Sequence, residues 1–315
     1  MITKHAPTAD QFAATAMICS ATVAAVTGAA SLAIGTTCDY ALIFPPRWLT
    51  FIAIALALVS LLVARVTNST HGTRTAGVLG WTAAVFFFGA SGGVILDGFR
   101  AFFWATGIPA GDFATVDWPG ATARAASLLA AATTVIWAWR LRAGRAHAAA
   151  DPVASARARK ALAWSAAAFA VPYPLLKLAW WVRDVATPST GPAAGPPVME
   201  ILAFGAVLVL VLLLLTASPR RRLPAWLVIS SGWCASMALL SMGFLMVFGL
   251  IAQATGVAAG SVQFVSGGAT VMVLSVYSTW LALGVVVLMA TLASIDASRP
   301  AHEARIVRAH ARIDE

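Results

Sequence analysis

Charged residues are scarce in this sequence. Asp, Glu, Lys and Arg make up only 10% of its 315 residues, whereas 60% are hydrophobic and the mean hydropathy is +0.84. A soluble globular domain carries about 25% charged residues, because polar groups must cover much of its surface. The composition therefore excludes a soluble domain and predicts a polytopic membrane protein.

Cysteine and histidine are also rare. The three cysteines, Cys19, Cys38 and Cys234, form no C-x-x-C motif, so neither a disulfide framework nor a thiol-redox enzyme is indicated. The five histidines form no cluster in the sequence. We therefore expect no metal site and no cofactor.

Eight apolar runs are long enough to cross about 30 Å of hydrocarbon. They lie near residues 12–34, 48–66, 78–96, 123–139, 161–182, 198–216, 223–251 and 269–295. The first run is too long for the apolar region of a typical signal peptide, and further spans follow it. The sequence predicts an all-α polytopic transmembrane helix bundle of about eight spans, forming a single integral membrane domain over residues 1–315.

The basic residues indicate the orientation of these helices. The net charge of +9 does not indicate nucleic acid as a partner, because Lys and Arg form short clusters between apolar runs and no single polar face. The clusters occupy alternate connections, at Arg65 and Arg74, at 140–160, at 220–222 and at 299–312. Short cytoplasmic loops are enriched in Lys and Arg. Both termini are therefore predicted to be cytoplasmic, in a protein of the cell membrane whose partners include membrane lipids.

A lysine within the fifth span is the residue whose charge costs the most free energy to place in a membrane. It belongs to a set of residues spaced i, i+4, i+7 and i+11, which share one face of a helix: Tyr173, Lys177, Trp180 and Asp184. Two prolines loosen the helix just before this stripe. A charge in a membrane segment usually faces the bundle interior or a wet cavity and pairs with a carboxylate, which predicts a functional site. The alternative is that Lys177 extends to the headgroups as an anchor.

A second polar position follows a small-residue motif in the third span. Gly89 and Gly93 form a G-x-x-x-G pattern, which lets two helices approach closely and would bring Asp97 into the bundle. Asp97 and Arg100 are three residues apart, so a local ion pair at a helix end is the alternative.

Three connections have distinct compositions. Residues 98–120 contain several aromatic side chains, including Trp104, which predicts a short amphipathic or re-entrant cap or an interfacial aromatic belt. Residues 140–160 are basic and rich in alanine, so we expect a helical extension near anionic headgroups. Residues 187–197 are rich in Pro, Gly and Ala and should be irregular.

These residue types fit an enzyme that acts on a prenyl or other lipid chain. Such an enzyme needs a carboxylic acid that protonates an alkene or epoxide, and aromatic faces that stabilise a carbocation. The candidate acids are Asp97, Glu200 and Asp39. The candidate substrate-binding residues are Tyr173, Lys177, Trp180, Trp104 and Tyr277.

The segment Pro172-Tyr173-Pro174-Leu175-Leu176-Lys177-Leu178-Ala179-Trp180 and the helix entry Pro46-Arg47-Trp48-Leu49 carry a resemblance. In these segments the chain resembles a broad set of poorly characterised actinobacterial multi-pass membrane proteins. In size and composition it is loosely similar to the bacterial membrane-bound terpene cyclases that act on prenylated indoles. This similarity is one of type, so no catalytic role is carried over to a residue of this chain.

The sequence thus favours a membrane enzyme, with a proton-initiated terpene cyclase of the isomerase type as the specific hypothesis, whose partner is a hydrophobic prenylated small molecule. Two alternatives stay open. A transporter for a small solute or lipid would also place a charge beside a broken helix, as Lys177 is placed. An accessory or self-protection protein without chemistry would need no motif at all. The oligomeric state is not predicted.

Overall fold

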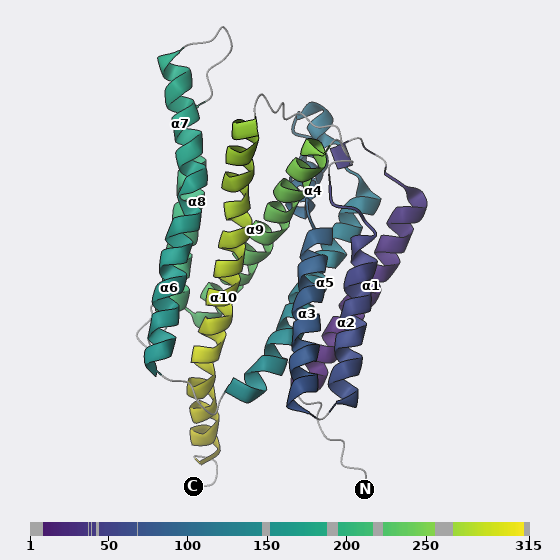
Figure 1. Cartoon of the computed structure of the whole chain (residues 1–315), viewed down its shortest axis with the longest axis vertical. Coiled ribbons are helices and arrows are strands. Elements are labelled where there is room, and N and C mark those ends of the chain that lie inside the picture. The colour runs from purple at the N-terminus through teal and green to yellow at the C-terminus, as the bar shows by residue number, and fades with distance from the viewer. Residues whose placement is uncertain are drawn as a thin grey trace. The chain divides into compact units, whose positions relative to one another are not determined.

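A computed structural model describes residues 9–36, 38, 40–41, 44–67, 69–146, 152–187, 195–216, 223–255 and 267–311 (Figure 1). Over these residues the chain is helical and contains no strand. The elements are α1 (Ala9–Ile34), α2 (Leu49–Val66), α3 (Thr70–Ala90), α4 (Val94–Thr106), the short 3-10 helix η2 (Gly111–Ala114), α5 (Trp118–Ala146), α6 (Pro152–Ala170), α7 (Pro172–Ala186), α8 (Val198–Leu215), α9 (Ala225–Ala254) and α10 (Gly267–Ala311).

Eight helical segments among the described residues are long and apolar enough to cross a membrane. They are Asp10–Ile34, Leu49–Val66, Thr70–Thr106, Trp118–Arg142, Ala156–Ala186, Val198–Leu215, Ala225–Ile251 and Leu274–Ala297. Each overlaps one of the eight runs expected from the sequence. The all-α polytopic fold is therefore confirmed, and the chain is an integral membrane protein.

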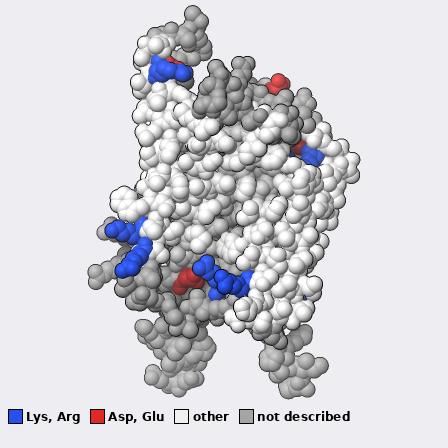
Figure 2. Space-filling model, in the orientation of Figure 1, with Lys and Arg blue, Asp and Glu red and all other residues white. Residues whose placement is uncertain are grey.

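The outward faces of these helices are apolar, as contact with lipid requires. Large side chains such as Leu58, Leu62, Leu202 and Leu212 are more than half exposed. Figure 2 shows that most of the visible surface of the described residues is uncharged, and that the Lys, Arg, Asp and Glu side chains in view lie in its upper and lower parts. Large apolar side chains exposed on many helices together are suited to contact with hydrocarbon.

The chain divides into two compact units. Unit 1 comprises Met1–Ala150 and Ser241–Thr270, and unit 2 comprises Asp151–Leu240 and Val271–Glu315. The division falls within α9, so this helix contributes residues to both units.

Small residues let the helices of unit 1 approach closely. Ala83 and Ala138 are fully buried, and a Cβ placed on Gly80 of α3 would lie 3.0 Å from Ala138 Cβ on α5. Ser60 of α2 donates a hydrogen bond to the Ala76 carbonyl over 2.7 Å and accepts one from Trp137 Nε1 over 3.2 Å. Close backbone packing with a few interhelical hydrogen bonds is the usual way in which membrane helices associate.

A sharp break separates α3 from α4. Gly93 has φ +96°, in the left-handed region, and caps the N-terminus of α4. A Cβ there would lie 2.6 Å from the Phe44 ring. The expectation that Gly89 and Gly93 form one helix-packing motif is therefore wrong, because the helix ends between them at Ala90. Gly93 makes the turn and admits Phe44, and this turn aims Asp97 inward.

Residues 98–120, expected to form either a short cap or an interfacial aromatic belt, contain most of α4 and all of η2, and this segment is called the cap below. On α4, Asp97 and Arg100 are buried, whereas Phe99, Phe102 and Trp104 are more than half exposed. The helix is thus amphipathic with its apolar face outward. Of the expected helical extension at 140–160, residues 140–146 are helical as the end of α5 and residues 152–160 as the start of α6, whereas 147–151 lie outside the described residues. Of the segment 187–197, Thr187 ends α7, residues 195–197 are irregular, and 188–194 lie outside the described residues.

Unit 2 has an aliphatic and aromatic core formed by α6, α7, α8, α9 and α10. Val211 and Leu214 of α8 pack in one cluster with Leu283, Val287 and Ala290 of α10. Val171 separates α6 from α7, because Pro172 and Pro174 carry no N–H to continue the helical hydrogen bonds. The expected loosening of this helix before Lys177 is therefore confirmed.

We expect Gly93→Ala to lower the free energy of unfolding by about 1–2 kcal/mol from the left-handed backbone alone, before any clash with Phe44 is counted. Gly98→Ala is the matched control: Gly98 lies on the exposed side of α4, and a Cβ there meets nothing within 4 Å. Unfolding in detergent micelles measures both. Equal stability of the two variants would show that neither the turn nor the Phe44 contact constrains the chain.

The predicted orientation is tested by fusing a topology reporter at two positions. A reporter after Arg142 should be cytoplasmic, because the neighbouring connection is rich in arginine, and one placed within residues 187–197 should face the outside. If both reporters lay on the same side, the α6–α7 segment would not cross the membrane.

Candidate functional site

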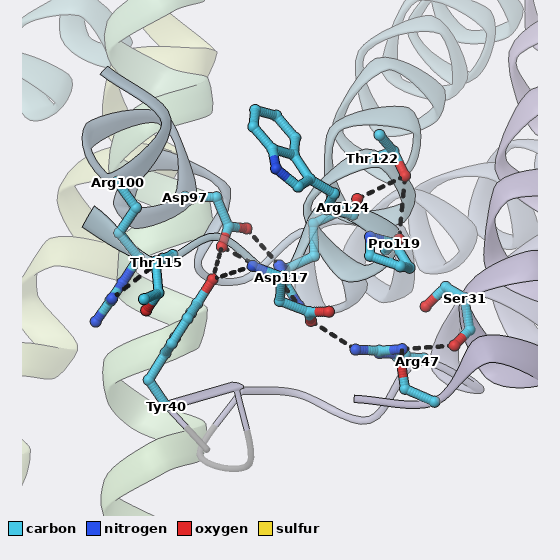
Figure 3. Close-up of polar contacts among 12 residues, drawn as sticks. Ser31, Tyr40, Arg47, Asp97, Arg100, Thr115, Asp117, Pro119, Thr122 and Arg124 are labelled. Atoms are coloured by element: carbon cyan, nitrogen blue, oxygen red, sulfur yellow. Dashed lines mark hydrogen bonds and ion pairs between the residues drawn. The ribbon is translucent and has the colours of Figure 1, made fainter. Parts of the chain in front are cut away.

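A buried ion pair lies at the start of α4 and α5 in unit 1 (Figure 3). Arg124 Nε donates to Asp97 Oδ2 over 2.6 Å, and Arg124 Nη2 donates to Asp97 Oδ1 over 3.0 Å. Asp97 is 3% exposed and Arg124 is 4% exposed. Both oxygens of the carboxylate are therefore used by one guanidinium, the strongest geometry for this pair of side chains.

A second carboxylate extends this pair into a network. Asp117 Oδ2 accepts from Arg47 Nη2 over 2.6 Å and lies 3.6 Å from Arg124 Nη2. Arg47 Nη1 also donates to the carbonyls of Ser31 and Gly35, over 2.6 and 2.9 Å. These carbonyls belong to the C-terminal end of α1, where a cation is favoured by the helix dipole. Arg47 thus joins the end of α1 to the start of α5.

Tyr40 connects the carboxylate of Asp97 to the backbone of Asp117. Its hydroxyl accepts a hydrogen bond from the backbone N–H of Asp117 over 2.7 Å and donates to Asp97 Oδ1 over 3.4 Å (Figure 3). Burial raises the pKa of the Tyr40 hydroxyl above its usual value, so the phenol remains protonated and able to donate. The stabilisation that the protonated phenol of Tyr40 provides is complete below about pH 10, the usual pKa of tyrosine. It is lost as the pH rises through the higher pKa of the folded state.

Arg100 holds the cap and does not pair with Asp97. Its Nη1 donates to the carbonyls of Asp112 and Thr115, over 3.1 and 3.4 Å, and its guanidinium lies 3.6 Å from the centroid of the Tyr40 ring. Among the described residues, no ion pair within 4.0 Å joins Asp97 to Arg100. The alternative of a local ion pair is therefore wrong. Arg100 instead fixes the segment that follows η2.

The network has the features of a structural element. Each carboxylate is paired with an arginine, and the carboxylate of Asp97 has no free oxygen for a substrate. Charges removed from water need such pairing, and the low dielectric around them makes loss of one partner expensive.

We expect Arg124→Met to lower the free energy of unfolding by about 3–5 kcal/mol, because Asp97 would stay buried without its partner. Arg124→Lys should recover part of this loss, since it restores the charge but not the fork of two donors. Denaturant unfolding in detergent measures both variants.

Arg140→Gln is the matched control. Arg140 pairs with Asp10 over 3.6 Å, and the two side chains are 30% and 76% exposed, so this change should cost at most about 1 kcal/mol. A loss for Arg124→Met as small as that for Arg140→Gln would contradict a tightly coupled buried network.

A different set of candidate residues surrounds a cavity in unit 2. The cavity has a volume of about 380 Å³ and lies between the end of α7 and the start of α8. Its lining includes Lys177, Trp180, Trp181, Asp184 and Glu200. Lys177 Nζ lies 5.8 Å from the Tyr173 ring centroid and 5.6 Å from the Trp180 ring centroid. The expected position of Lys177 between aromatic faces is confirmed.

The charges around this cavity are less tightly paired than those in unit 1. Within the described residues, Lys177 has no carboxylate oxygen within 4.0 Å, although Asp184 and Glu200 line the same cavity. Lys177 and Glu200 are both half-buried. Asp184 lies 3.3 Å from Arg183 on the same helix. The ammonium and the Glu200 carboxyl group therefore remain accessible to a ligand.

An aromatic cluster lies on the inner side of the Lys177 stripe. Tyr173 contacts Phe204, Tyr277 and Trp280, with ring centroids 5.4, 5.5 and 4.8 Å away. Trp280 Nε1 is buried and has no hydrogen-bond partner among the residues that the structure describes. Tyr173 and Tyr277 thus come together as expected, but as packed core residues.

The sequence-predicted residues fall into two groups. Unit 2 holds Glu200, Tyr173, Lys177, Trp180 and Tyr277, whereas unit 1 holds Asp97 and Trp104. Trp104 is 60% exposed and packs edge-to-face on Trp118. Asp39 lies outside the described residues.

Sequence reasoning did not single out the partners of Asp97. Arg124, Asp117, Arg47 and Tyr40 form most of the buried network. One signal was present: Arg124 falls inside a predicted span, and a charge there requires a partner.

Within the described residues, no group of three or more His, Cys, Asp or Glu side chains could hold a metal ion. Comparisons of the chain with protein-family models, with curated proteins and with solved structures find no match. The geometry of the two units is therefore the basis for any functional assignment.

Proposed function

We propose that this chain is an integral membrane enzyme of the cell membrane that acts on a prenyl or other lipid substrate, with the cavity beside Lys177 as its active site. One observation supports this most strongly: two carboxyl groups, an ammonium group and two indoles line the same cavity. Its volume of about 380 Å³ lies within the range of small-molecule sites, about 300–1,000 Å³.

Glu200 is the proton donor in this proposal. It lies in the first turn of α8, half-buried, and borders the cavity. We rank it ahead of Asp97, because both oxygens of Asp97 accept hydrogen bonds from Arg124. A carboxyl group that borders a cavity can reach a substrate, which is the first requirement for general acid catalysis.

The reaction is an isomerisation. The Glu200 carboxyl group gives its proton to one carbon of an alkene, which breaks the π bond, forms a C–H bond and leaves a cation on the other carbon. The face of Trp181 stabilises that cation while a second alkene of the substrate closes a ring. A proton then leaves a neighbouring carbon and returns to the Glu200 carboxylate. The product has the mass of the substrate, and the enzyme is regenerated.

Lys177 binds the polar end of the substrate. Its ammonium carries three donors, and it makes no ion pair with the described acids around the cavity. A hydroxyl or anionic group of an amphiphilic prenyl compound would accept hydrogen bonds from it. The cationic intermediate must then form at the end of the chain away from Lys177.

We expect purified protein in lipid vesicles to convert a prenylated or epoxidised prenyl compound to an isomer without an added cofactor. Glu200→Gln removes the transferable proton while keeping the side-chain shape, so conversion should fall by about 100-fold or more. Asp112→Asn is the matched control, because Asp112 is exposed on η2 and lies in unit 1. Product is measured by chromatography and mass spectrometry.

Full conversion by Glu200→Gln would remove Glu200 from the proposed chemistry.

A carrier is the second candidate, because the α6–α7 break at Pro172 lies one helical turn and a half before a cation that borders a cavity. If no isomer forms and the same vesicles accumulate a solute in a gradient-dependent way, the chain is a carrier and the enzyme proposal is wrong.

A further inference from the structure

A groove in unit 1 has no part in the proposed reaction. It has a volume of about 470 Å³ and lies between α3 and α5. The residues that define it are Arg74, Gly77, Val78, Trp81, Leu141 and Arg142. α3 and α5 lie side by side in Figure 1, and the groove is at the end where α3 begins and α5 ends.

Glycine positions explain why the groove exists. Where Gly80 meets Ala138, the two helices are so close that an added Cβ would lie only 3.0 Å from its neighbour. One turn away, a Cβ added at Gly77 would meet nothing within 4 Å. The helices therefore leave space at Gly77, and the missing side chain keeps this space open.

The two arginines give the groove a positive charge at the ends of two membrane-spanning segments. Arg142 is the last residue of its membrane span, and Arg74 is in the first turns of another. They come from two different helices and line one groove, whose lining contains no acidic residue. Basic pockets between helices at this depth suit anionic lipid headgroups.

The remaining lining suits a hydrocarbon chain. Val78 is 60% exposed, and Trp81 is half-buried with one side on the groove. Tryptophan is favoured at the boundary between headgroups and hydrocarbon, where part of the ring contacts each.

We propose that this groove binds one anionic phospholipid, with its phosphate between Arg74 and Arg142 and an acyl chain against Val78 and Trp81. A lipid fits better than a free anion, because a free anion would leave the apolar part of the groove empty. This site lies in a different unit from the Lys177 cavity and requires no turnover. It therefore stands or falls independently of the enzyme proposal.

The test is lipid retention by the full chain, measured by native mass spectrometry after reconstitution with phosphatidylglycerol or phosphatidylcholine. We expect the wild type to retain one phosphatidylglycerol in preference to phosphatidylcholine. Arg74→Gln and Arg142→Gln should each weaken binding by about 5-fold, and together by about 25-fold, because a basic residue near an anionic headgroup contributes on the order of that factor.

Two further variants separate a groove from a general attraction to positive charge. Gly77→Leu keeps both arginines and fills the open space, so it should also abolish selective retention. Arg65→Gln is the matched control: Arg65 is exposed in the last turn of α2, before α3 begins, and does not line the groove. Its loss should change binding less than 2-fold, since no charge leaves the groove.

Three results would overturn the proposal: equal retention of phosphatidylglycerol and phosphatidylcholine, an effect of Arg65→Gln as large as that of Arg74→Gln, or unchanged binding by Gly77→Leu. Displacement of the lipid by inorganic phosphate alone would identify a free-anion site and also contradict a lipid. The circular dichroism of each variant confirms that its helices are formed before binding is compared.

Discussion

The pairing of Asp97 with Arg124 is the constraint on which the organisation of unit 1 depends. A carboxylate and a guanidinium that are both nearly inaccessible to water must satisfy each other, and each restricts the elements that carry it. Gly93 turns the chain so that α4 presents Asp97, and Phe44 fills the space beside that turn. Arg47, Tyr40 and Asp117 then hold the neighbouring segments in place. Around this network the interior of the unit is polar, whereas the outward faces of its helices are apolar.

The spans could be predicted from the sequence because crossing hydrocarbon imposes a length and a composition on each helix. The network could not, because its hydrogen bonds join residues that are 27, 57, 70 and 77 positions apart. No local pattern encodes such distances. The G-x-x-x-G motif was misleading for a related reason: spacing alone does not reveal whether a glycine packs a helix or ends it with a positive φ.

The stripe around Lys177, in contrast, could be predicted from the sequence. Its members lie on one short helix, so the spacing of 4 and 3 residues was enough to place Tyr173 and Trp180 on either side of the ammonium. The proximity of Glu200 was not encoded in that way, because α8 is a separate helix beyond residues 188–194. Local contacts followed from the sequence, and contacts between helices required the tertiary structure.

The amphipathic character of α4 has a consequence for biosynthesis. Asp97 leaves the ribosome before Arg124, so for a time the carboxylate has no partner. An isolated carboxylate would resist entry into hydrocarbon, but a helix with Phe99, Phe102 and Trp104 on its outer face can rest at the membrane surface with its charge in water. Arg124 lies near the start of α5, so its guanidinium becomes available once that helix has been synthesised. The aromatic face of this helix would thus let α4 lie at the membrane surface until Arg124 has been synthesised. A uniformly apolar helix carrying the same carboxylate would lack such a surface-bound state.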